Sequence, residues 1–321
     1  MTRPTRARAA LTAAVLCAVA ALAGCTADTP PHAAPAAKAT TAAPSAHAPA
    51  DTSCQPRRSL RPSGGLPQPG HMPAGSYMAQ IQKKGRLVLG TSQDTLLFSS
   101  RNPFTGAVEG FDVDMGHQIA EAIFGDPDKL TIKVIPNEKR VDDAADGTVD
   151  LVAYTMTINC ARWKRVNFST VYYDAGQKVL VSTSSAAKGI GDLGGKRVCA
   201  PNGSTSLDNI AKAPSKPVAV GRASFGDCLV AFQQNEVDAI STDDTILAGL
   251  AAQDPYAHVV GDKFTQEPYG LAMSQQHPEF TRFVNAVLER NRANGTWKRT
   301  YDRWLGRFGP APQPPAAEYR D

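Results

Sequence analysis

Two similar stretches restrict the fold of this chain more than any other feature. "DGTVDLVAYT" (146–155) and "QNEVDAISTD" (234–243) each contain a polar helix end, a short Val-Asp-apolar strand and then hydroxyl-bearing residues. Ligands of open α/β sheets bind outside the carboxyl ends of the strands. The sequence therefore predicts two α/β units that present equivalent, polar strand ends.

The residues around these stretches alternate between strand and helix patterns. A short helix is expected to end at Gly85, before a strand over 86–92. "EGFDVD" (109–114) alternates like a strand, and Asp114 is expected to cap the helix that follows. Asn235 is expected to end a later helix in the left-handed conformation. Further strands are expected in "LTIKVIP", "KRVCAPN" and "VAVGRA", and an apolar helical stripe over 280–288. This order predicts mostly parallel sheets flanked by helices.

The first 24 residues carry a targeting pattern. Three arginines precede an apolar run that is too short to span a bilayer well, and "LAGC" leads to Cys25. That string resembles the lipobox of bacterial lipoproteins, in which the cysteine is lipidated and becomes the mature N-terminus. The alternative is an ordinary secretory signal cleaved nearby, which would leave Cys25 as an odd thiol. The expected location is the extracytoplasmic face of the cell membrane, through a lipid anchor on Cys25.

The remaining cysteines predict disulfides. With Cys17 in the signal and Cys25 used for lipid, four cysteines are left, an even number for an exported and oxidising setting. Three pairings are possible, and proximity favours Cys199–Cys228, which leaves Cys54–Cys160. The sequence has no CxxC and no nearby histidine pair, so neither a metal nor another cofactor is expected.

Composition separates two segments from the rest of the chain. Residues 26–53 are rich in Ala, Pro and Thr, so residues 25–75 are expected to form a tether and an N-terminal extension. Residues 309–321 form a Pro-rich tail. The signal arginines account for most of the formal charge of +4, and no basic cluster with interleaved aromatics occurs. Nucleic acid is therefore not an expected partner.

The stretch "YTMTINCARWKRVNFSTVYYDAG" (154–176) carries the main chemical signal. It places threonines, Cys160 and Arg162 directly after a buried strand. A solvated surface patch and a ligand clamp would both have this composition. Arginine suits a clamp because its planar, permanently charged guanidinium can hold a carboxylate through two hydrogen bonds.

Four stretches together closely resemble the polar amino-acid-binding family of solute-binding proteins, cluster 3 of the periplasmic-binding-protein type II fold. They are "LVLGTS…EGFDVDMGHQIAEAIFG", "DGTVDLVAYTMTINCARWKRVNFSTVYYDAGQKVLV", "RVCAPNGSTS" with "VDAISTDDTIL", and "EPYGLAM…NGTWKRTYDRWLG". Their order is that of the family, and they cover nearly all of residues 76–308.

The resemblance implies a two-lobed α/β fold in which two strands form the hinge and an amino acid occupies the cleft. Lobe one is expected at 76–181 and 266–308, and lobe two at 182–265. Closure of the lobes over the ligand is a hinge motion that creates a surface for a partner.

The same resemblance implies roles for individual residues. The family places an arginine for the α-carboxylate five residues after a Thr or Ser, which matches Arg162 and Thr157. Asp243 matches the carboxylate that receives the α-ammonium, although it could instead cap the next helix. The other ligand positions implied by the match are Thr155, Gly203, Thr205 and Ser206.

The side chain of the ligand is less constrained. Arg140 matches the arginine that glutamate- and aspartate-binding members use for the distal carboxylate, but it could equally be a solvated cation at a helix start. Some of those members also carry a basic residue just after the first strand, where this chain reads "TSQD" (91–94). The expected ligand is therefore glutamate or aspartate, with asparagine and glutamine as alternatives.

Three functions are compatible with this pattern. The leading hypothesis is a lipid-anchored receptor that delivers an amino acid to the permease of an ABC importer. A second hypothesis is a subunit that reports the same ligand to a membrane sensor or kinase. A third is a dehydratase-like enzyme, which would need a general acid or base beside the ligand. No such group is indicated, so the chain is not expected to be an enzyme.

Overall fold

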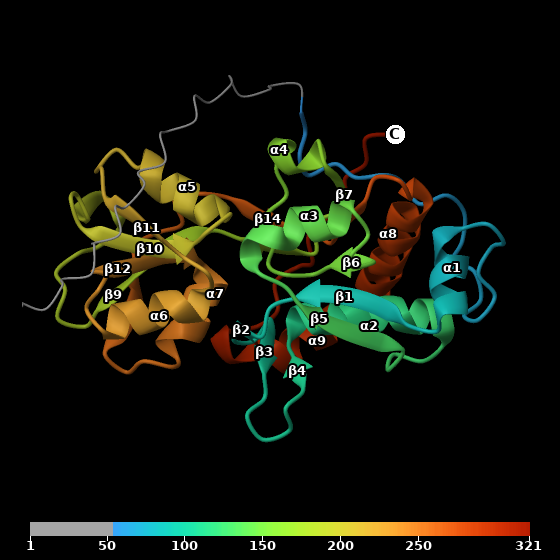
Figure 1. Ribbon diagram of the computed structural model, residues 1–321, viewed down its shortest axis with the longest axis horizontal. Helices are drawn as coiled ribbons and strands as arrows, with labels where there is room; N and C mark the ends of the chain where they lie inside the picture. The colour runs from blue at the N-terminus through green and yellow to red at the C-terminus, as the bar shows by residue number, and fades with distance from the viewer. Residues whose placement is uncertain (1–53) are drawn as a thin grey trace, which may run out of the picture. The chain divides into compact units, whose positions relative to one another are not determined.

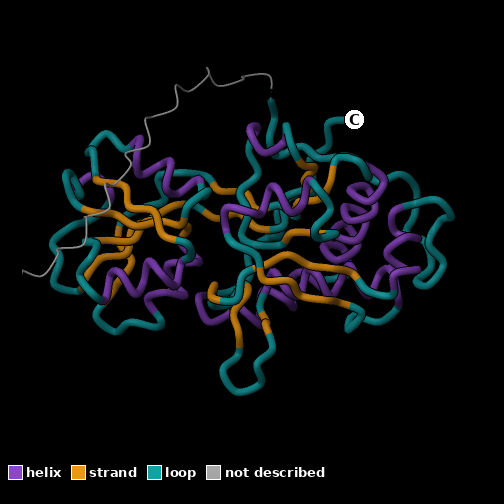
Figure 2. The backbone as a smooth tube through the Cα atoms, in the orientation of Figure 1, coloured by secondary structure: helices purple, strands orange, loops and turns teal. Residues whose placement is uncertain are grey.

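The computed structural model describes residues 54–321 (Figure 1). The expected signal segment, Cys25 and the tether over 26–53 lie outside the described residues. Within the described part, two five-stranded sheets form the centres of two α/β lobes. Helices flank both sheets (Figure 2).

The first sheet has the order β5-β1-β6-β15-β7. Its strands are β5 (Leu130–Val134), β1 (Leu87–Thr91), β6 (Leu151–Val152), β15 (Ala272–Ser274) and β7 (Val166–Phe168). Strand β1 pairs in parallel with β5 and β6, whereas β15 pairs antiparallel with β6 and β7. The sheet is therefore mixed rather than mostly parallel, because the chain returns from the other lobe to supply β15.

The second sheet has the order β11-β10-β12-β9-β13. Its strands are β11 (Val218–Arg222), β10 (Arg197–Pro201), β12 (Ala239–Asp243), β9 (Gln177–Ser182) and β13 (Ala257–Val260). It is mixed in the same way. Strand β9, which the expected boundary assigned to lobe one, belongs to this sheet because it pairs with β12 and β13.

Two chain segments connect the sheets and run beside each other. They are β8 (Tyr173–Ala175) and β14 (Glu267–Tyr269), which pair antiparallel. A small third sheet consists of β2 (Asp94–Thr95), β3 (Ser99–Arg101) and β4 (Val108–Glu109).

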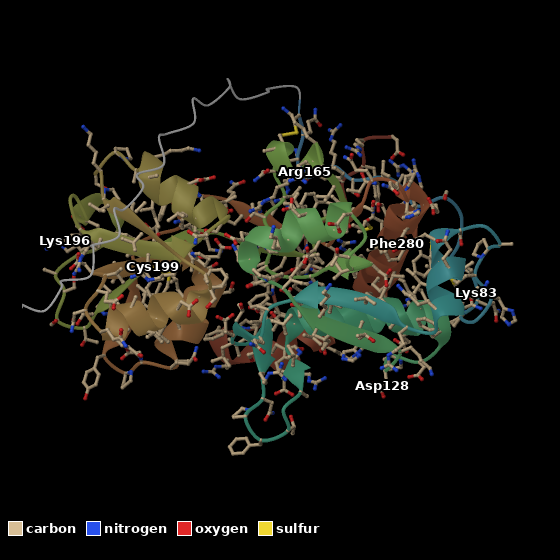
Figure 3. All side chains as sticks on the ribbon, viewed as in Figure 1. Lys83, Asp128, Arg165, Lys196, Cys199 and Phe280 are labelled. Atoms are coloured by element: carbon tan, nitrogen blue, oxygen red, sulfur yellow. A yellow bond between two sulfur atoms is a disulfide. The ribbon has the colours of Figure 1, made fainter. Side chains whose placement is uncertain are left out.

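The helices of the first lobe cover an aromatic and aliphatic core. They are α1 (Tyr77–Lys84), α2 (Phe111–Phe124), α3 (Arg140–Ala145), α4 (Cys160–Trp163), α8 (Pro278–Ala293) and α9 (Thr296–Trp304). The side chain of Ser76 caps α1, and Gly85 ends this helix with φ 83°, as expected. Phe280, labelled in Figure 3, is buried with the rest of the expected stripe on α8.

The start of α2 differs from the expectation. Residues 111–114 are helical, and Gly110 occupies the N-cap position with φ 144°. A Cβ at Gly110 would lie 2.2 Å from the carbonyl oxygen of Phe98, so only glycine fits there. Asp114 is therefore inside the helix, where it accepts a hydrogen bond from the indole of Trp304 at 2.8 Å.

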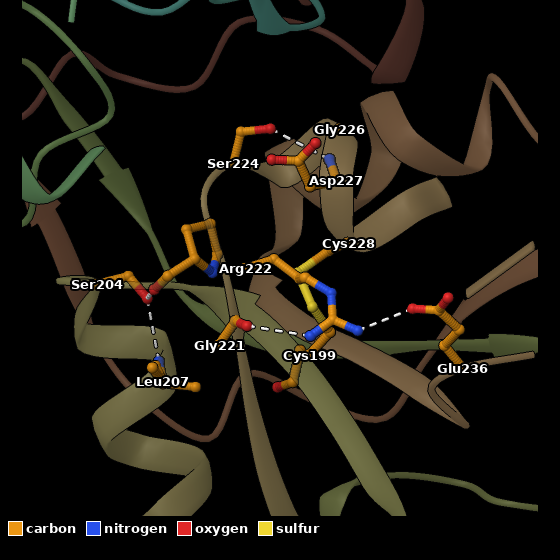
Figure 4. The surroundings of a disulfide bond; sticks show 12 residues. Cys199, Ser204, Leu207, Gly221, Arg222, Ser224, Gly226, Asp227, Cys228 and Glu236 are labelled. Carbon is orange, nitrogen blue, oxygen red and sulfur yellow. Dashed lines mark hydrogen bonds and ion pairs between the residues drawn. A yellow bond between two sulfur atoms is a disulfide. The ribbon is translucent and has the colours of Figure 1, made fainter. Parts of the chain in front are cut away.

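The second lobe is formed by α5 (Thr205–Lys212), α6 (Phe225–Gln233) and α7 (Asp244–Ala251) around its sheet. Asn235 follows α6 with φ 57°, the left-handed conformation predicted from the sequence. A disulfide joins Cys199 on β10 to Cys228 on α6 (Figure 4).

The second disulfide, Cys54–Cys160, fixes the N-terminal extension to α4. Ser59 is fully buried, and its hydroxyl donates to the carbonyl oxygen of Phe168 at 2.6 Å. The C-terminal tail lies beside the same segment, because Ser59 forms a β-bridge with Tyr319. Both disulfides have the pairing that proximity favoured in the sequence.

Candidate ligand-binding site

The candidate site lies at the two strand ends that the sequence singled out. Residues 153–157 follow β6 in the first lobe, and Asp243 ends β12 in the second. The hinge strand β14 lies between them, since Thr157 forms a β-bridge with Tyr269 and the Tyr269 hydroxyl donates to Asp243 Oδ2 at 2.5 Å. Tyr269 on the hinge strand therefore links the candidate residues of the first lobe to Asp243 in the second.

Arg162 is held in place by the short helix α4. The Asn159 side chain caps this helix by accepting from the Arg162 amide at 2.9 Å. The guanidinium donates to the carbonyl oxygens of Thr157 at 2.6 Å and Gly203 at 3.1 Å. Burial, followed by the charge of Arg140, lowers the pKa of Arg162 to about 9, so it stays charged at neutral pH. Within the described residues, Arg162 forms no ion pair with a carboxylate.

Arg140 is buried deeper, with 3% of its surface exposed. It donates to the carbonyl oxygens of Asn137 at 2.8 Å, Tyr154 at 3.1 Å and Gly203 at 3.3 Å. Its guanidinium also lies 5.2 Å from the centre of the Tyr154 ring. Arg140 is therefore not a solvated cation, and three of its five N–H donors hold backbone carbonyls of both lobes.

Thr155 adopts a conformation that is rare for a β-branched residue. Its φ is 41°, and its amide donates to Asp112 Oδ2 at 2.7 Å. The Thr155 hydroxyl is buried and has no hydrogen-bond partner. Asp112, which is fully buried, also accepts from the Tyr172 hydroxyl at 2.6 Å. Burial raises the pKa of Asp112 to about 7.

Asp243 stands at the N-cap position of α7, but its side chain caps nothing. One carboxylate oxygen accepts from Tyr269, and the other, Oδ1, is buried without a partner. Burial, with a smaller contribution from Glu267, raises the pKa of Asp243 well above the usual range of a carboxyl group. The Asp243 side chain therefore does not cap α7, which was the alternative role expected for it.

Glu267 on β14 organises the hydroxyls of both lobes. Its Oε2 accepts from Thr157 at 2.6 Å and from Thr205 at 2.9 Å. Its Oε1 accepts from Thr265 at 2.8 Å and from Asn209 at 3.1 Å. The hydroxyl protons of Thr157 and Thr205 are thus directed to Glu267, and their oxygens remain as acceptors.

The other residues of the lobe-two loop surround this contact. The Ser206 hydroxyl lies 3.0 Å from that of Thr242. The amides of Thr205 and Ser206 belong to the first turn of α5. The N–H groups of a first turn have no carbonyl partner within their own helix. Gly203 has φ 70°, and a Cβ there would lie 2.9 Å from the Cα of Glu138. The Gly203 carbonyl oxygen accepts hydrogen bonds from Arg140 and Arg162, and the absence of a side chain lets this loop lie close to the first lobe.

A cavity of about 370 Å³ is lined by residues of both lobes, including Asp94, but by none of the ligand residues predicted from the sequence. Asn137 and Tyr154 contribute from the first lobe, and Ser224 from the second. Asn137 is buried; its side-chain nitrogen donates to the carbonyl oxygen of Asn202 at 2.7 Å, and its Oδ1 has no partner.

Comparison with known proteins identifies the family. Residues 87–307 match the model of the bacterial extracellular solute-binding proteins, family 3. The chain belongs to this family. The ABC transporter glutamine-binding protein GlnH of Bacillus subtilis is 34% identical over 229 residues, which are 71% of this chain and 84% of that protein. The glutamate-binding protein GluB of Corynebacterium glutamicum is 31% identical, over 72% of this chain and 81% of that one.

Solved structures agree with the fold of this family 3 protein. An ancestral arginine-binding protein bound to glutamine has a TM-score of 0.63 and 29% identity, with 69% of this chain and 98% of that chain covered. A mutant of ArgBP from T. maritima has a TM-score of 0.66 and 26% identity, over 71% and 99%. The two-lobed type II fold is thereby confirmed. These relatives are binding proteins, in agreement with the expectation that the chain is not an enzyme.

The structure adds functional candidates to this family 3 protein that the sequence did not reveal. Asp112 lies in a stretch that was expected to be a strand, and the contacts of Glu267, Tyr269 and Asn137 join segments that are distant in the chain. The signal for Asp112 in the sequence was its place between the apolar residues Phe111 and Val113.

Among residues 54–321, no helix is long and apolar enough to cross a membrane. In the same part of the chain, no group of three or more His, Cys, Asp or Glu side chains is placed to hold a metal ion.

Proposed function

We propose that this protein captures a polar α-amino acid, glutamine first, between its two lobes and delivers it to an ABC importer. The observation that carries this proposal is an unpaired cation and an unpaired carboxyl oxygen at the strand ends of the two lobes. Arg162 has no carboxylate partner among the described residues, and Asp243 has a buried oxygen without a donor. Burial lowers the pKa of Arg162 overall, but the nearby carboxylates of Glu267, Asp208 and Asp243 oppose this shift.

The head group of an amino acid matches both charges. Its carboxylate suits the Arg162 guanidinium and the amides at the start of α5, because both donate to anions. Its ammonium suits Asp243 Oδ1 and the free oxygen of Thr155. Binding a cation favours the ionised form of Asp243, so the proposed contact offsets the burial that now raises the pKa of this group.

The side-chain preference follows from the charges that are already present. Arg140 already donates to three backbone carbonyl oxygens, and Arg162 is the proposed partner of the α-carboxylate. A further carboxylate on the ligand would enter without a new cation. A side-chain amide avoids this cost, and its N–H can donate to the unpartnered Oδ1 of Asn137. We therefore place glutamine before the glutamate or aspartate that the Arg140 match suggested.

The route of delivery rests on family membership and on the N-terminal pattern. The first relative named above is a component of an ABC transporter, and the proposed role of Cys25 is to hold the protein at the outer face of the membrane. Replacement of Cys25 by alanine should release the protein into the medium, and deletion of the gene should reduce uptake of labelled glutamine. Unchanged uptake would favour the sensor hypothesis instead.

A calorimetric titration of the purified chain with each of the twenty amino acids tests the binding proposal. Glutamine should bind most tightly, and glutamate should bind more weakly at neutral pH. If none of the twenty binds, the proposed function is wrong. If glutamate binds more tightly than glutamine, the argument from the charges of the site is wrong.

A further inference from the structure

The contact between Asp94 and α6 crosses from one lobe to the other. Asp94 lies on β2 of the first lobe, and its Oδ2 accepts from the Gly226 amide of the second lobe at 2.9 Å. The two residues are separated by 132 positions in the chain. The Asp94 carboxylate thus bonds to the backbone of the other lobe.

The amide that Asp94 meets is one that α6 leaves without a partner. Ser224 caps this helix, and its hydroxyl accepts from the Asp227 amide at 3.1 Å (Figure 4). The Gly226 amide is in the first turn, so it has no carbonyl within the helix to bond. A carboxylate at this end of a helix is also favoured by the helix dipole.

Glycine makes the approach possible. A Cβ at position 226 would lie 2.8 Å from Asp94 Oδ2, closer than carbon and oxygen atoms pack. A second contact has the same form, since a Cβ at Gly249 on α7 would lie 3.1 Å from the carbonyl oxygen of Leu96. Residues 94–96 therefore meet α6 and α7 at two glycines, whose missing side chains leave room for the close approach.

We propose that Asp94 is an affinity-determining residue that acts by holding the lobes closed, through its bond to the Gly226 amide. This inference rests on the proposed function, in which the lobes close over an amino acid. In an open form the Asp94 carboxylate and the Gly226 amide would face water. The bond then adds to the stability of the closed, ligand-bound form alone and slows release of the ligand.

Two substitutions test the two sides of the bond. Asp94→Ala removes the acceptor but also changes a residue that lines the cavity, whereas Gly226→Ala displaces the carboxylate, because its Cβ would lie 2.8 Å from Asp94 Oδ2, and leaves the cavity lining unchanged. Gly226 is not in the left-handed region, and alanine is the better helix former, so Gly226→Ala should not destabilise the ligand-free protein. Asp227→Ala is the matched control, because Asp227 is an exposed carboxylate in the first turn of the same helix, one position after Gly226.

The measurement is the association and dissociation rate of L-glutamine by stopped-flow fluorescence, with L-glutamate as a second probe if it binds. Asp94→Ala and Gly226→Ala should each raise the dissociation rate about 10- to 100-fold, as expected for loss of a hydrogen bond to a charged group. The association rate should change little, because the bond forms after closure. The two effects should not add in the double variant, since both substitutions remove one contact.

Several outcomes would overturn the inference. They are a native dissociation rate in Asp94→Ala, full additivity in the double variant, an equal effect of Asp227→Ala, or a change in the ratio of glutamine to glutamate affinity. The last outcome would make Asp94 a ligand contact. Failure of the unmodified protein to bind any amino acid would instead refute the proposed function, so the two failures are distinguishable.

Discussion

Replacement of Arg162 by alanine tests the proposed clamp most directly. The guanidinium is held by two carbonyl oxygens, of Thr157 and Gly203, and has no carboxylate partner among the described residues. Its substitution would leave the α-carboxylate of the ligand in a closed cleft without a counterion. Removal of one partner of a buried ion pair costs about 3–5 kcal/mol. At 1.4 kcal/mol for each factor of ten, the dissociation constant should rise about 100- to 4,000-fold.

The assay is isothermal titration calorimetry with glutamine, combined with thermal unfolding of the ligand-free protein. Arg165→Ala is the matched control. Arg165 lies in the same segment but forms an exposed ion pair with Asp142 at 2.8 Å, and such pairs contribute about 0–1 kcal/mol. The control should therefore bind nearly normally. Arg162→Lys keeps the positive charge but loses the planar guanidinium that can donate two parallel hydrogen bonds, so its affinity for glutamine should be intermediate. Affinity within a few-fold of normal in a folded Arg162→Ala protein would refute the assignment.

Three further predictions concern the buried carboxylates and a disulfide. Asp243→Asn should weaken glutamine binding at least tenfold at neutral pH. In the unmodified protein the affinity for glutamine should fall on acidification at a pH above the usual pKa of aspartate, because the pKa of Asp243 is raised. An affinity that does not change with pH would contradict this. The pKa of Asp112 is raised in the folded protein, so ionisation of this group reduces the free energy of unfolding as the pH rises from about 4 to about 7. Urea titrations of Asp112→Asn should show a smaller loss of stability over this pH range. An unchanged loss of stability would show that Asp112 does not cause it. The double substitution Cys54→Ser, Cys160→Ser opens a loop of 106 residues and should cost about 2–5 kcal/mol of stability. The affinity for glutamine should also fall, because Cys160 lies on the helix that carries Arg162. An unchanged affinity would show that α4 is positioned without the disulfide.

Local patterns predicted most elements near the site. The strand ends at Thr155 and Asp243 were visible because a short apolar strand followed by hydroxyls is a pattern of neighbouring residues. Gly85 and Asn235 were correctly placed as helix ends, since the left-handed conformation favours these two residue types. The start of α2 was missed because the approach of Gly110 to the Phe98 carbonyl is a contact between separate segments.

The pairing within the sheets was beyond the reach of these patterns. A βαβ order predicts parallel neighbours, yet β9 and β15 reach their sheets from the connections between the lobes and pair antiparallel. The crossing of the chain between two sheets has no local signature. Their mixed character became visible only in the structure.

The sequence by itself determined that the chain forms two α/β units with polar strand ends, and it drew attention to Arg162 and Asp243. Residue type and local spacing carry that information. Tertiary structure decided which partners those groups have. Glu267 accepts from Thr157 across 110 positions, and Asp94 meets Gly226 across 132. Whether a buried charge is paired depends on contacts of this kind, because only folding brings such distant residues within hydrogen-bond distance.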